Sequence, residues 1–395
     1  MSILLHRMAK YKVPQIAMQN GLYPYFRIIE SEQDTEVTIN NKKVLMFGSN
    51  SYLGLTSHPK VKEAAKNAID KYGSGCAGSS FLNGTLKLHK ELEHKLAEFV
   101  HKEEAIVFST GFQVNLGVIS SLTGRNDYIL IDEYDHASII EGTRLSFSKV
   151  RKFKHNDTHS LEKELKACDK GQIKLIVVDG IFSMEGNIVK LPEIVRLAAK
   201  YGASVMVDDA HALGVIGDSG RGTASHFGLT NEVDLIMGTF SKSLASVGGF
   251  IASDHHTINY IRHHARSLIF SASMPPASAA SVIAALDIIL TEPERIARLW
   301  ENTNYALDNF KQMGFDTGMS ETPIIPLYVR DVNKTFKFTM RLLDEGIFVN
   351  PVVSPAVSPD SSLIRFSLMA THEIDQIDIA LEKFRKVGIE MGIIK

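Results

Sequence analysis

The sequence predicts an α/β fold, in which a large domain with a mostly parallel sheet precedes a smaller α+β domain. Three observations support this: a length of 395 residues, short apolar runs that alternate with helical patterns, and a change in that rhythm near residue 281. A chain of this length exceeds the size at which one hydrophobic core stops growing, so we expect more than one domain. Strands that alternate with helices favour a parallel sheet covered on both faces.

The composition is that of a soluble globular protein without a nucleic-acid partner. Apolar residues make up 44%, charged residues 22%, and the net charge is −2, so no basic field favours nucleic acid or an anionic membrane. Two cysteines, Cys76 and Cys168, exclude a disulfide framework and favour a cytoplasmic location. We expect no signal peptide and no membrane-spanning helix. A peripheral membrane contact stays open, although we recognise no basic amphipathic helix.

The first elements expected are two helices. Residues 58–72 place apolar side chains at helical spacing after a proline at the helix start, and residues 88–100 repeat the pattern. Six apolar runs bounded by turn residues then predict buried strands, with helical patterns such as 191–201 between them. These runs are AIVFS (105–109), DYILID (127–132), KLIVVD (174–179), ASVMVDD (203–209), DLIMG (234–238) and GGFIAS (248–253).

The last part of the chain reads as a separate unit. Helical patterns at 281–290 and 295–313 precede isolated strand candidates at 324–329 and 363–369. We therefore divide the chain into an N-terminal segment (1–45), a large domain (46–280) and a small C-terminal domain (281–395). The stretch NPVVSPAVSPDSS is the most loop-like, and loops on a rigid scaffold often carry function.

Reactive side chains follow the predicted strands at their carboxyl ends, where open α/β sheets bind ligands. Taken singly, each has an ordinary structural interpretation, since a strand-end aspartate is often a helix cap and a strand-end histidine is usually structural. Together they would bring an amine, a carboxylate, two imidazoles and several hydroxyls to one edge of one sheet. The residues are Thr110, Gly111, Phe112, His136, Ser183, Asp208, His211, Thr239, Ser241 and Lys242.

This set of groups favours pyridoxal phosphate as the cofactor. The segment STGFQ offers backbone N–H groups at a helix start, where a phosphate is favoured, and Thr239 and Ser241 add hydroxyl donors. Lys242, surrounded by small residues, would have a lowered pKa and could attack a carbonyl. A buried carboxylate would keep a heteroaromatic nitrogen protonated. Phosphate, aldehyde and pyridine together describe this cofactor.

Other ligand classes fit the sequence less well. It contains neither the GxGxxG pattern of dinucleotide sites nor the GxxxxGK[ST] pattern of P-loops. A zinc site from His136, His211 and Asp208 is conceivable, but their spacing matches no metal motif, so we expect no metal.

From about residue 20 to the C-terminus the chain resembles the α-oxoamine synthases, pyridoxal phosphate enzymes of fold type I that condense an amino acid with an acyl thioester and release carbon dioxide. Within that family the sequence is most similar to the bacterial serine palmitoyltransferases, particularly in the segments FLNGT, GTFSKSLAS and NPVVSPAV. The motifs that carry the resemblance occur in family order: GSNSYLGL, GSGCAGSSFLNGT, STGFQVNLG, DHASI, DGIFSMEG, VDDAHALG, GTFSKSLASVGG, FSASMPPA and LIRFSLMATH.

The resemblance implies an aminotransferase-like fold with a seven-stranded, mostly parallel sheet, and a homodimer with shared active sites. The catalytic group it implies is Lys242, His136, Asp208 and His211, with Lys242 attached to the cofactor and acting as acid and base at the substrate α-carbon. Asp208 would pair with the pyridine nitrogen, while His211 and Ser183 lie near the ring oxygen and His136 stacks on the ring. Gly111, Phe112, Thr239 and Ser241 would hold the phosphate, and Ser271 and Ala272, like FLNGT, would serve the partner's cofactor. Arg365, Asn50, Tyr52 and Ser80 would bind substrate.

The activity implied is condensation of L-serine with palmitoyl-CoA to 3-oxosphinganine, CoA and carbon dioxide, the first step of sphingolipid synthesis. One departure leaves the substrate pair open: Ser80 stands where the family usually has arginine after GS. The alternatives are cysteate, another amino acid, or acyl carrier protein in place of CoA.

Two further classes are less favoured. A catalytically silent subunit would have little need to retain Lys242, and an aminotransferase or aldolase would not share GSNSYLGL and IRFSLMATH. We interpret Glu185 and Asp209 as structural or solvated.

Overall fold

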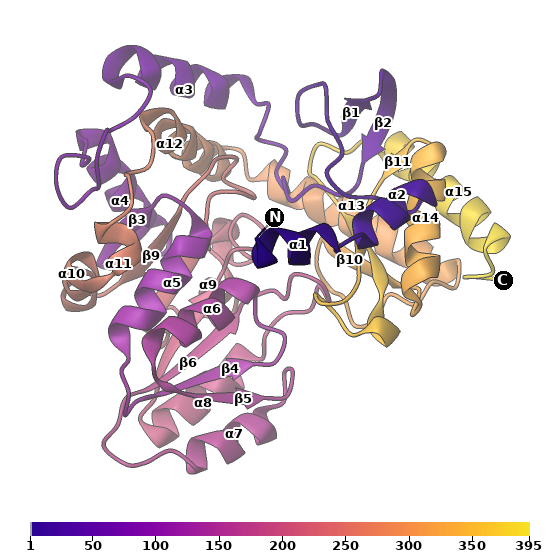
Figure 1. The fold of residues 1–395 in the computed structure, drawn as a ribbon. Helices are drawn as coiled ribbons and strands as arrows, with labels where there is room; N and C mark the ends of the chain where they lie inside the picture. Colours follow the sequence, from indigo (N-terminus) through magenta and orange to yellow (C-terminus); the bar gives the residue numbers. More distant parts are fainter. Residues whose placement is uncertain (1) are drawn as a thin grey trace.

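A seven-stranded sheet forms the centre of the large domain, in the order β3-β9-β8-β7-β6-β4-β5 (Figure 1). The computed structural model describes residues 2–395. The strands are β3 (Glu104–Phe108), β4 (Tyr128–Asp132), β5 (Lys149–Phe153), β6 (Lys174–Asp179), β7 (Ser204–Asp208), β8 (Leu235–Thr239) and β9 (Gly249–Ser253). The ladders among β5, β4, β6, β7 and β8 are parallel, and β9 is antiparallel to both of its neighbours. The prediction of a mostly parallel, seven-stranded sheet is confirmed.

The strand that the apolar runs did not predict is β5, at the edge of the sheet. Its sequence KVRKF carries three cations, and only Phe153 is buried. An edge strand can face solvent with charged side chains, which also protect it from pairing with another chain. It therefore lacks the apolar run that marks a central strand.

Helices bury both faces of this sheet, as the continuous apolar runs require. In β4, Ile129 and Ile131 pack with the helices α5 and α6, whereas Tyr128 and Leu130 belong to the core on the opposite face. The helices of the large domain are α3 (Pro59–Tyr72), α4 (Lys87–Phe99), α5 (Gly111–Leu122), α6 (Ala137–Ser146), α7 (Thr158–Lys166), α8 (Leu191–Tyr201), α9 (Thr223–His226), α10 (His255–His264), α11 (Arg266–Ile269) and α12 (Pro276–Thr291), with a 3-10 turn at Asp218–Gly220.

The small domain combines segments from both ends of the chain. It contains two three-stranded sheets, β1-β2-β11 and β10-β13-β12, in which β1 and β2 come from before the large domain. Its elements are β1 (Glu36–Ile39), β2 (Lys42–Met46), α13 (Glu294–Gln312), β10 (Ile324–Tyr328), α14 (Val332–Asp344), β11 (Ile347–Phe348), β12 (Asn350–Val352), a 3-10 turn at Pro359–Ser361, β13 (Leu363–Ser367) and α15 (Ile374–Glu390).

The strands expected at 324–329 and 363–369 correspond to β10 and β13, while the short strands β1, β2, β11 and β12 were not predicted. The division that we drew at residues 45 and 281 falls inside β2 and α12.

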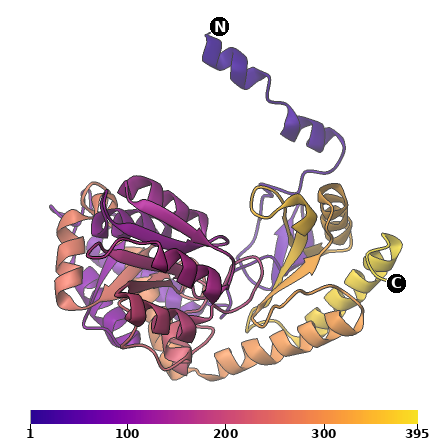
Figure 2. The same cartoon turned by 90° about the horizontal axis from the view of Figure 1, so that it is seen from below.

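A helical arm, α1 (Ile3–Ala9) and α2 (Val13–Gln19), precedes the small domain and stands away from the body of the molecule (Figure 2). Neither helix contains a buried residue. Leu4, Leu5 and Met8 are exposed on α1, basic residues occupy its last turn, and the first acidic residue of the chain is Glu30.

No single helix within residues 2–395 is long and apolar enough to cross a membrane. Helices α12 and α13 meet the length and composition criterion only together, and they are bent by 79° at their junction.

Candidate active site

The sheet brings the predicted side chains together at the carboxyl ends of β6, β7 and β8. Asp179 ends β6 and pairs in register with Asp208 at the end of β7, which in turn lies beside Met237 of β8. Thr239 ends β8, and Lys242 follows three residues later. Parallel strands therefore deliver the carboxylates and the amine to one edge of the sheet.

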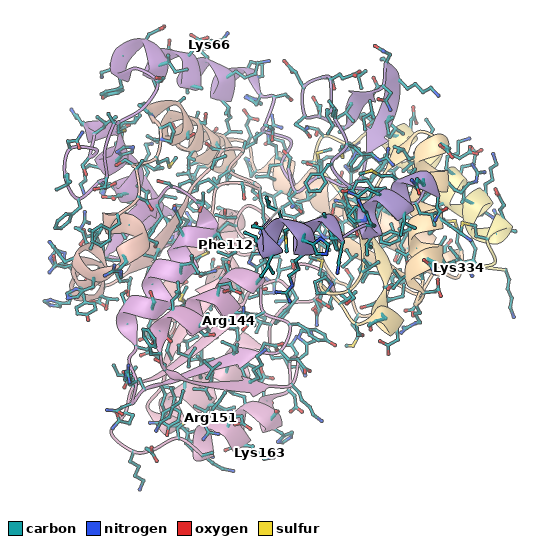
Figure 3. All side chains as sticks on the ribbon, viewed as in Figure 1. Lys66, Phe112, Arg144, Arg151, Lys163 and Lys334 are labelled. Carbon is teal, nitrogen blue, oxygen red and sulfur yellow. The ribbon has the colours of Figure 1, made fainter. Side chains whose placement is uncertain are left out.

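A cavity of about 320 Å³ occupies this edge. The predicted cofactor residues that line it are Gly111, Phe112, His136, Asp208, His211, Thr239, Ser241 and Lys242. Phe112, at the N-terminus of α5 (Figure 3), is 44% exposed, so the cavity opens to the surface beside it. The structure thus joins eight residues that the sequence scatters between positions 111 and 242.

Two further cavities adjoin the first. One of about 570 Å³ also contains His136, His211 and Lys242, and adds Asn50, Ser183 and Arg365. A third, of about 430 Å³, shares His136 and Ser183 with the second. Both are bordered by the loop that the sequence marked as 350–362.

Lys242 has the electrostatic character of a reactive amine. Burial lowers the pKa of Lys242 from 10.5 to about 8, because desolvation outweighs the opposing fields of Asp208 and Asp179. Near physiological pH a minor fraction of such an amine is neutral, far more than for a lysine with the ordinary pKa, and this fraction can act as a nucleophile or base.

Hydrogen bonds hold Asp208 in place. The backbone N–H of Ala210 donates to one carboxylate oxygen at 3.0 Å, and the Asn115 amide donates to the other at 2.7 Å. The carboxylate is almost fully buried, so these donors replace the water it has lost.

His211, Tyr52 and Arg365 form a buried chain. Arg365 donates from Nη2 to the Tyr52 hydroxyl at 3.1 Å, and that hydroxyl lies 2.7 Å from His211 Nδ1. Because a guanidinium only donates, the Tyr52 oxygen accepts from Arg365. Burial, with the positive fields of Lys242 and Arg365, holds the pKa of His211 well below its usual range, so the ring stays neutral.

Arg365 retains donors for a ligand. Its Nε donates to the carbonyl of Ser183 at 2.7 Å and its Nη1 to the hydroxyl of Ser367 at 2.7 Å. With the bond to Tyr52, three of the five N–H groups of a guanidinium are paired within the chain.

Four predicted residues do not line the cavities that contain Lys242: Ser80, Ser271, Ala272 and Tyr52. Ser80 contacts the Ser273 hydroxyl at 3.0 Å and lines a separate cavity of about 200 Å³. The Ser271 hydroxyl accepts from Gln113 at 3.1 Å, and the Ala272 carbonyl accepts from the hydroxyl of Ser109. Within one chain, therefore, Ser80, Ser271 and Ala272 are not brought to the amine. Tyr52 itself lines neither cavity, but its hydroxyl hydrogen-bonds both Arg365 and His211, which do.

The sequence analysis missed three residues of the site. Asp179 lines the first cavity, accepts a hydrogen bond from the His136 backbone at 3.1 Å, and has a pKa raised well above its usual value by burial. Asn115 and Ser138 are buried and connect Asp208 with His136. Asp179 ends a predicted strand and could have been found there, but polar side chains inside helices carry no such signal.

Asp209 and Glu185, which we interpreted as structural or solvated, differ in their surroundings. Asp209 accepts from the Thr223 backbone at 2.9 Å and lines none of the cavities around Lys242, and burial raises its pKa to about 7. Glu185 is half-buried and lines the third cavity, and burial raises its pKa. No group of three His, Cys, Asp or Glu side chains within residues 2–395 could hold a metal ion.

The donor set fits pyridoxal phosphate. An added Cβ at Gly111 would lie 2.5 Å from Thr239 Oγ1, so only glycine lets the start of α5 approach the end of β8 this closely and brings its N–H groups beside the Thr239 hydroxyl. The first-turn N–H groups of α5 have no intrahelical partner, and Thr239 Oγ1 and Ser241 Oγ lie 3.1 Å apart. An anion site, an amine of lowered pKa and a buried carboxylate surround one cavity.

Comparison with known proteins gives a consistent result. A family model for aminotransferase class I and II matches residues 42–384. A serine palmitoyltransferase from Sphingobacterium spiritivorum is 62% identical over 384 residues, covering 97% of this chain and 96% of that protein. One from Bacteroides ovatus is 60% identical over 386 residues, covering 98% of each. A solved serine palmitoyltransferase from S. paucimobilis, with a bound aldimine of PLP and myriocin, is 36% identical with a TM-score of 0.96 over 100% of both chains.

Proposed function

Because this chain belongs to the aminotransferase class I and II family, and relatives 62% and 60% identical to it are serine palmitoyltransferases, we propose that it condenses L-serine with a long-chain acyl-CoA such as palmitoyl-CoA. The products are 3-oxosphinganine, CoA and carbon dioxide, and the reaction is the first step of sphingolipid synthesis. The enzyme is an acyltransferase that uses pyridoxal phosphate. The observation that carries the proposal is the position of Lys242, at the wall shared by the cofactor cavity and the larger substrate cavity.

Each end of the cofactor has a group of this chain suited to hold it. Lys242 would hold the aldehyde end and Asp208 the pyridine nitrogen, while the N–H groups that begin α5 and the hydroxyls of Thr239 and Ser241 would hold the phosphate. Bound pyridoxal phosphate supplies an electron sink that makes the proton on the amino-acid α-carbon removable.

The chain's own residues then position the amino acid and move that proton. Arg365 binds the substrate carboxylate through its two remaining N–H groups, and Asn50 lies in the same cavity. The Lys242 amine, with a pKa near 8, takes the proton from the α-carbon and later returns one. His211 is neutral and fixed by Tyr52, so it offers a hydrogen bond to the ring oxygen without adding a charge.

The larger cavity suits a long acyl chain. Besides Asn50 and Arg365, apolar and aromatic side chains border it: Tyr25, Phe26, Met184, Phe348, Val352 and Val353. Burying methylene groups against such walls contributes about 0.8 kcal/mol per CH₂, so a long chain gains affinity that a short one lacks.

We further propose a homodimer in which each copy completes the other's site. Phe112 and Val247 line the cofactor cavity, yet they are 44% and 57% exposed, and Phe81, Leu82 and Phe270 are exposed as well. Apolar side chains around a cofactor cavity support burial by a second copy, which would also bring Ser80, Ser271 and Ala272 to the partner's cavity.

We place the enzyme in the cytoplasm, with a peripheral membrane contact through α1. Cys76 and Cys168 are unpaired, which supports a reducing compartment. The exposed apolar residues and basic last turn of α1 support an interfacial contact with anionic lipid.

The deciding experiment offers serine, cysteate, glycine or alanine with palmitoyl-CoA to the purified holoenzyme and measures thiol release. We expect serine to give the highest kcat/KM. If cysteate supports release and serine does not, the substrate assignment is wrong, and a Ser80→Arg variant then tests whether this position sets the preference.

A further inference from the structure

We propose that Asn115 is a positioning residue that couples the Asp208 carboxylate to the His136 imidazole and fixes the tautomer of that ring. Asn115 lies in α5 and is fully buried. Its Nδ2 donates to Asp208 Oδ2 at 2.7 Å and to Ser138 Oγ at 2.8 Å, so both amide protons are used. The inference deepens the proposed function and rests on it, since Asp208 and His136 are the groups assigned to the cofactor ring.

The orientation of the amide follows from its neighbours. An ionised carboxylate only accepts hydrogen bonds, so the nitrogen of Asn115, and not its oxygen, must face Asp208. The opposite orientation would place two oxygens against each other. Asn115 Oδ1 has no partner in the chain, so the two bonds donated by Nδ2 are the side chain's only hydrogen bonds within residues 2–395.

Ser138 transmits this orientation to His136. The Ser138 oxygen accepts from Asn115, so its own proton can be donated, and His136 Nδ1 lies 2.7 Å away. The backbone N–H of Ser138 also donates to Nδ1, at 3.2 Å. With two donors directed at it, Nδ1 must be the unprotonated nitrogen, and the ring proton resides on Nε2.

The remaining environment keeps His136 neutral. Burial lowers its pKa, the field of Asp208 opposes that effect, and the field of Lys242 reinforces it. His136 borders the two cavities that contain Lys242 and the third cavity that adjoins them. Since Nδ1 is occupied by Ser138, the Nε2–H group is the donor that His136 retains for a ligand.

The Asn115 amide therefore sets the position of the Asp208 carboxylate relative to the His136 Nε2–H group, and these two groups come from different strand ends. Asp208 follows β7, and His136 follows β4, with β6 between them. A bound ring must satisfy both groups at once, so a small displacement of either would weaken its binding.

A buried asparagine can also be merely structural, and the chain offers a matched control. Asn302 in α13 is likewise fully buried. Its Nδ2 donates to the carbonyls of Met369 and His372 at 3.1 and 2.8 Å, and its Oδ1 has no partner. It lines none of the cavities around Lys242.

The test compares Asn115→Ala, Ser138→Ala and Asn302→Ala with the wild-type chain. Binding of pyridoxal phosphate to each apoprotein is titrated by absorbance. The His136 tautomer is read from ¹⁵N shifts of histidine-labelled apoprotein, with His136→Gln identifying the signal. We expect wild-type His136 to carry its proton on Nε2. Asn115→Ala should weaken cofactor binding about 10- to 100-fold, the scale of a lost hydrogen bond to a charged group, and disturb the His136 signal.

Ser138→Ala should disturb the same signal, and Asn302→Ala should leave both readouts unchanged even if it lowers the melting temperature. A wild-type His136 protonated on Nδ1, or equal cofactor affinities for Asn115→Ala and Asn302→Ala, overturns the inference. If the wild type binds the cofactor as described but serine releases no thiol, the proposed substrate fails while the role of Asn115 stands.

Discussion

The Tyr52 hydroxyl lies 2.7 Å from His211 Nδ1, although the two residues are 159 positions apart in the chain. Arg365, from β13 of the small domain, donates to the same hydroxyl. One phenol thus connects the segment between β2 and α3, the loop after β7 and a strand of the small domain. The substrate-side wall of the site exists only where these three segments meet.

Tyr52→Phe should lower kcat/KM for serine about tenfold. Removing the hydroxyl leaves a buried donor on Arg365 and a buried ring nitrogen of His211 without their shared partner, which costs about 1–3 kcal/mol. Steady-state thiol release measures the effect. Tyr201→Phe is the control, because its hydroxyl bonds Glu162 at 2.9 Å away from the site. Equal losses in the two variants would show that Tyr52 supports stability alone.

Lys242→Ala should abolish covalent attachment of the cofactor. The purified wild type is expected to be yellow, and borohydride should fix the cofactor on Lys242, as mass spectrometry of the labelled peptide would show. Lys102→Met is the control, since Lys102 is also a lysine whose pKa burial lowers, but it donates to the carbonyls of Thr230 and Val233. A colourless wild type, or label on another lysine, would refute the site.

The rate of pyridoxal phosphate uptake by the apoprotein should rise with pH around a midpoint near 8. Only the neutral amine attacks an aldehyde, and burial lowers the pKa of Lys242 from 10.5 to about 8. Stopped-flow absorbance at constant ionic strength gives the profile. A midpoint near 10.5 would mean that the amine is solvated and that the cavity does not tune it.

The Asp209→Asn variant should lose part of the pH dependence of stability. Burial raises the pKa of Asp209 from 3.8 to about 7, so the folded chain holds this proton more tightly than the unfolded chain. The stabilisation from this group is therefore complete below about pH 4 and is lost as the pH rises to about 7. Urea unfolding across that range should give a steeper fall for the wild type than for the variant. Parallel curves would contradict the assignment, since asparagine cannot titrate.

Most of the large domain could be predicted because its central strands are buried on both faces and read as apolar runs. Lys242, Asp208 and His211 follow such runs, so their arrival at one sheet edge was predictable from the order of strands and helices. β5 was not, because an edge strand such as KVRKF needs no apolar run. The strands β11 and β12, of two and three residues, are too short to show any periodicity.

What the sequence by itself determined is the chemistry: the amine, the carboxylate and the anion-binding turn are local features, each set by a strand end or a helix start. The tertiary structure alone decided which polar residues connect them. Asn115 bonds Asp208, 93 positions away, and Ser138, 23 positions away. Tyr52 bonds His211, 159 positions away, and no local sequence pattern encodes such pairings. A hydrogen bond tolerates only a few tenths of an ångström of change in its donor–acceptor distance. These distances are fixed only when the helices pack on the sheet and the small domain packs against the large one.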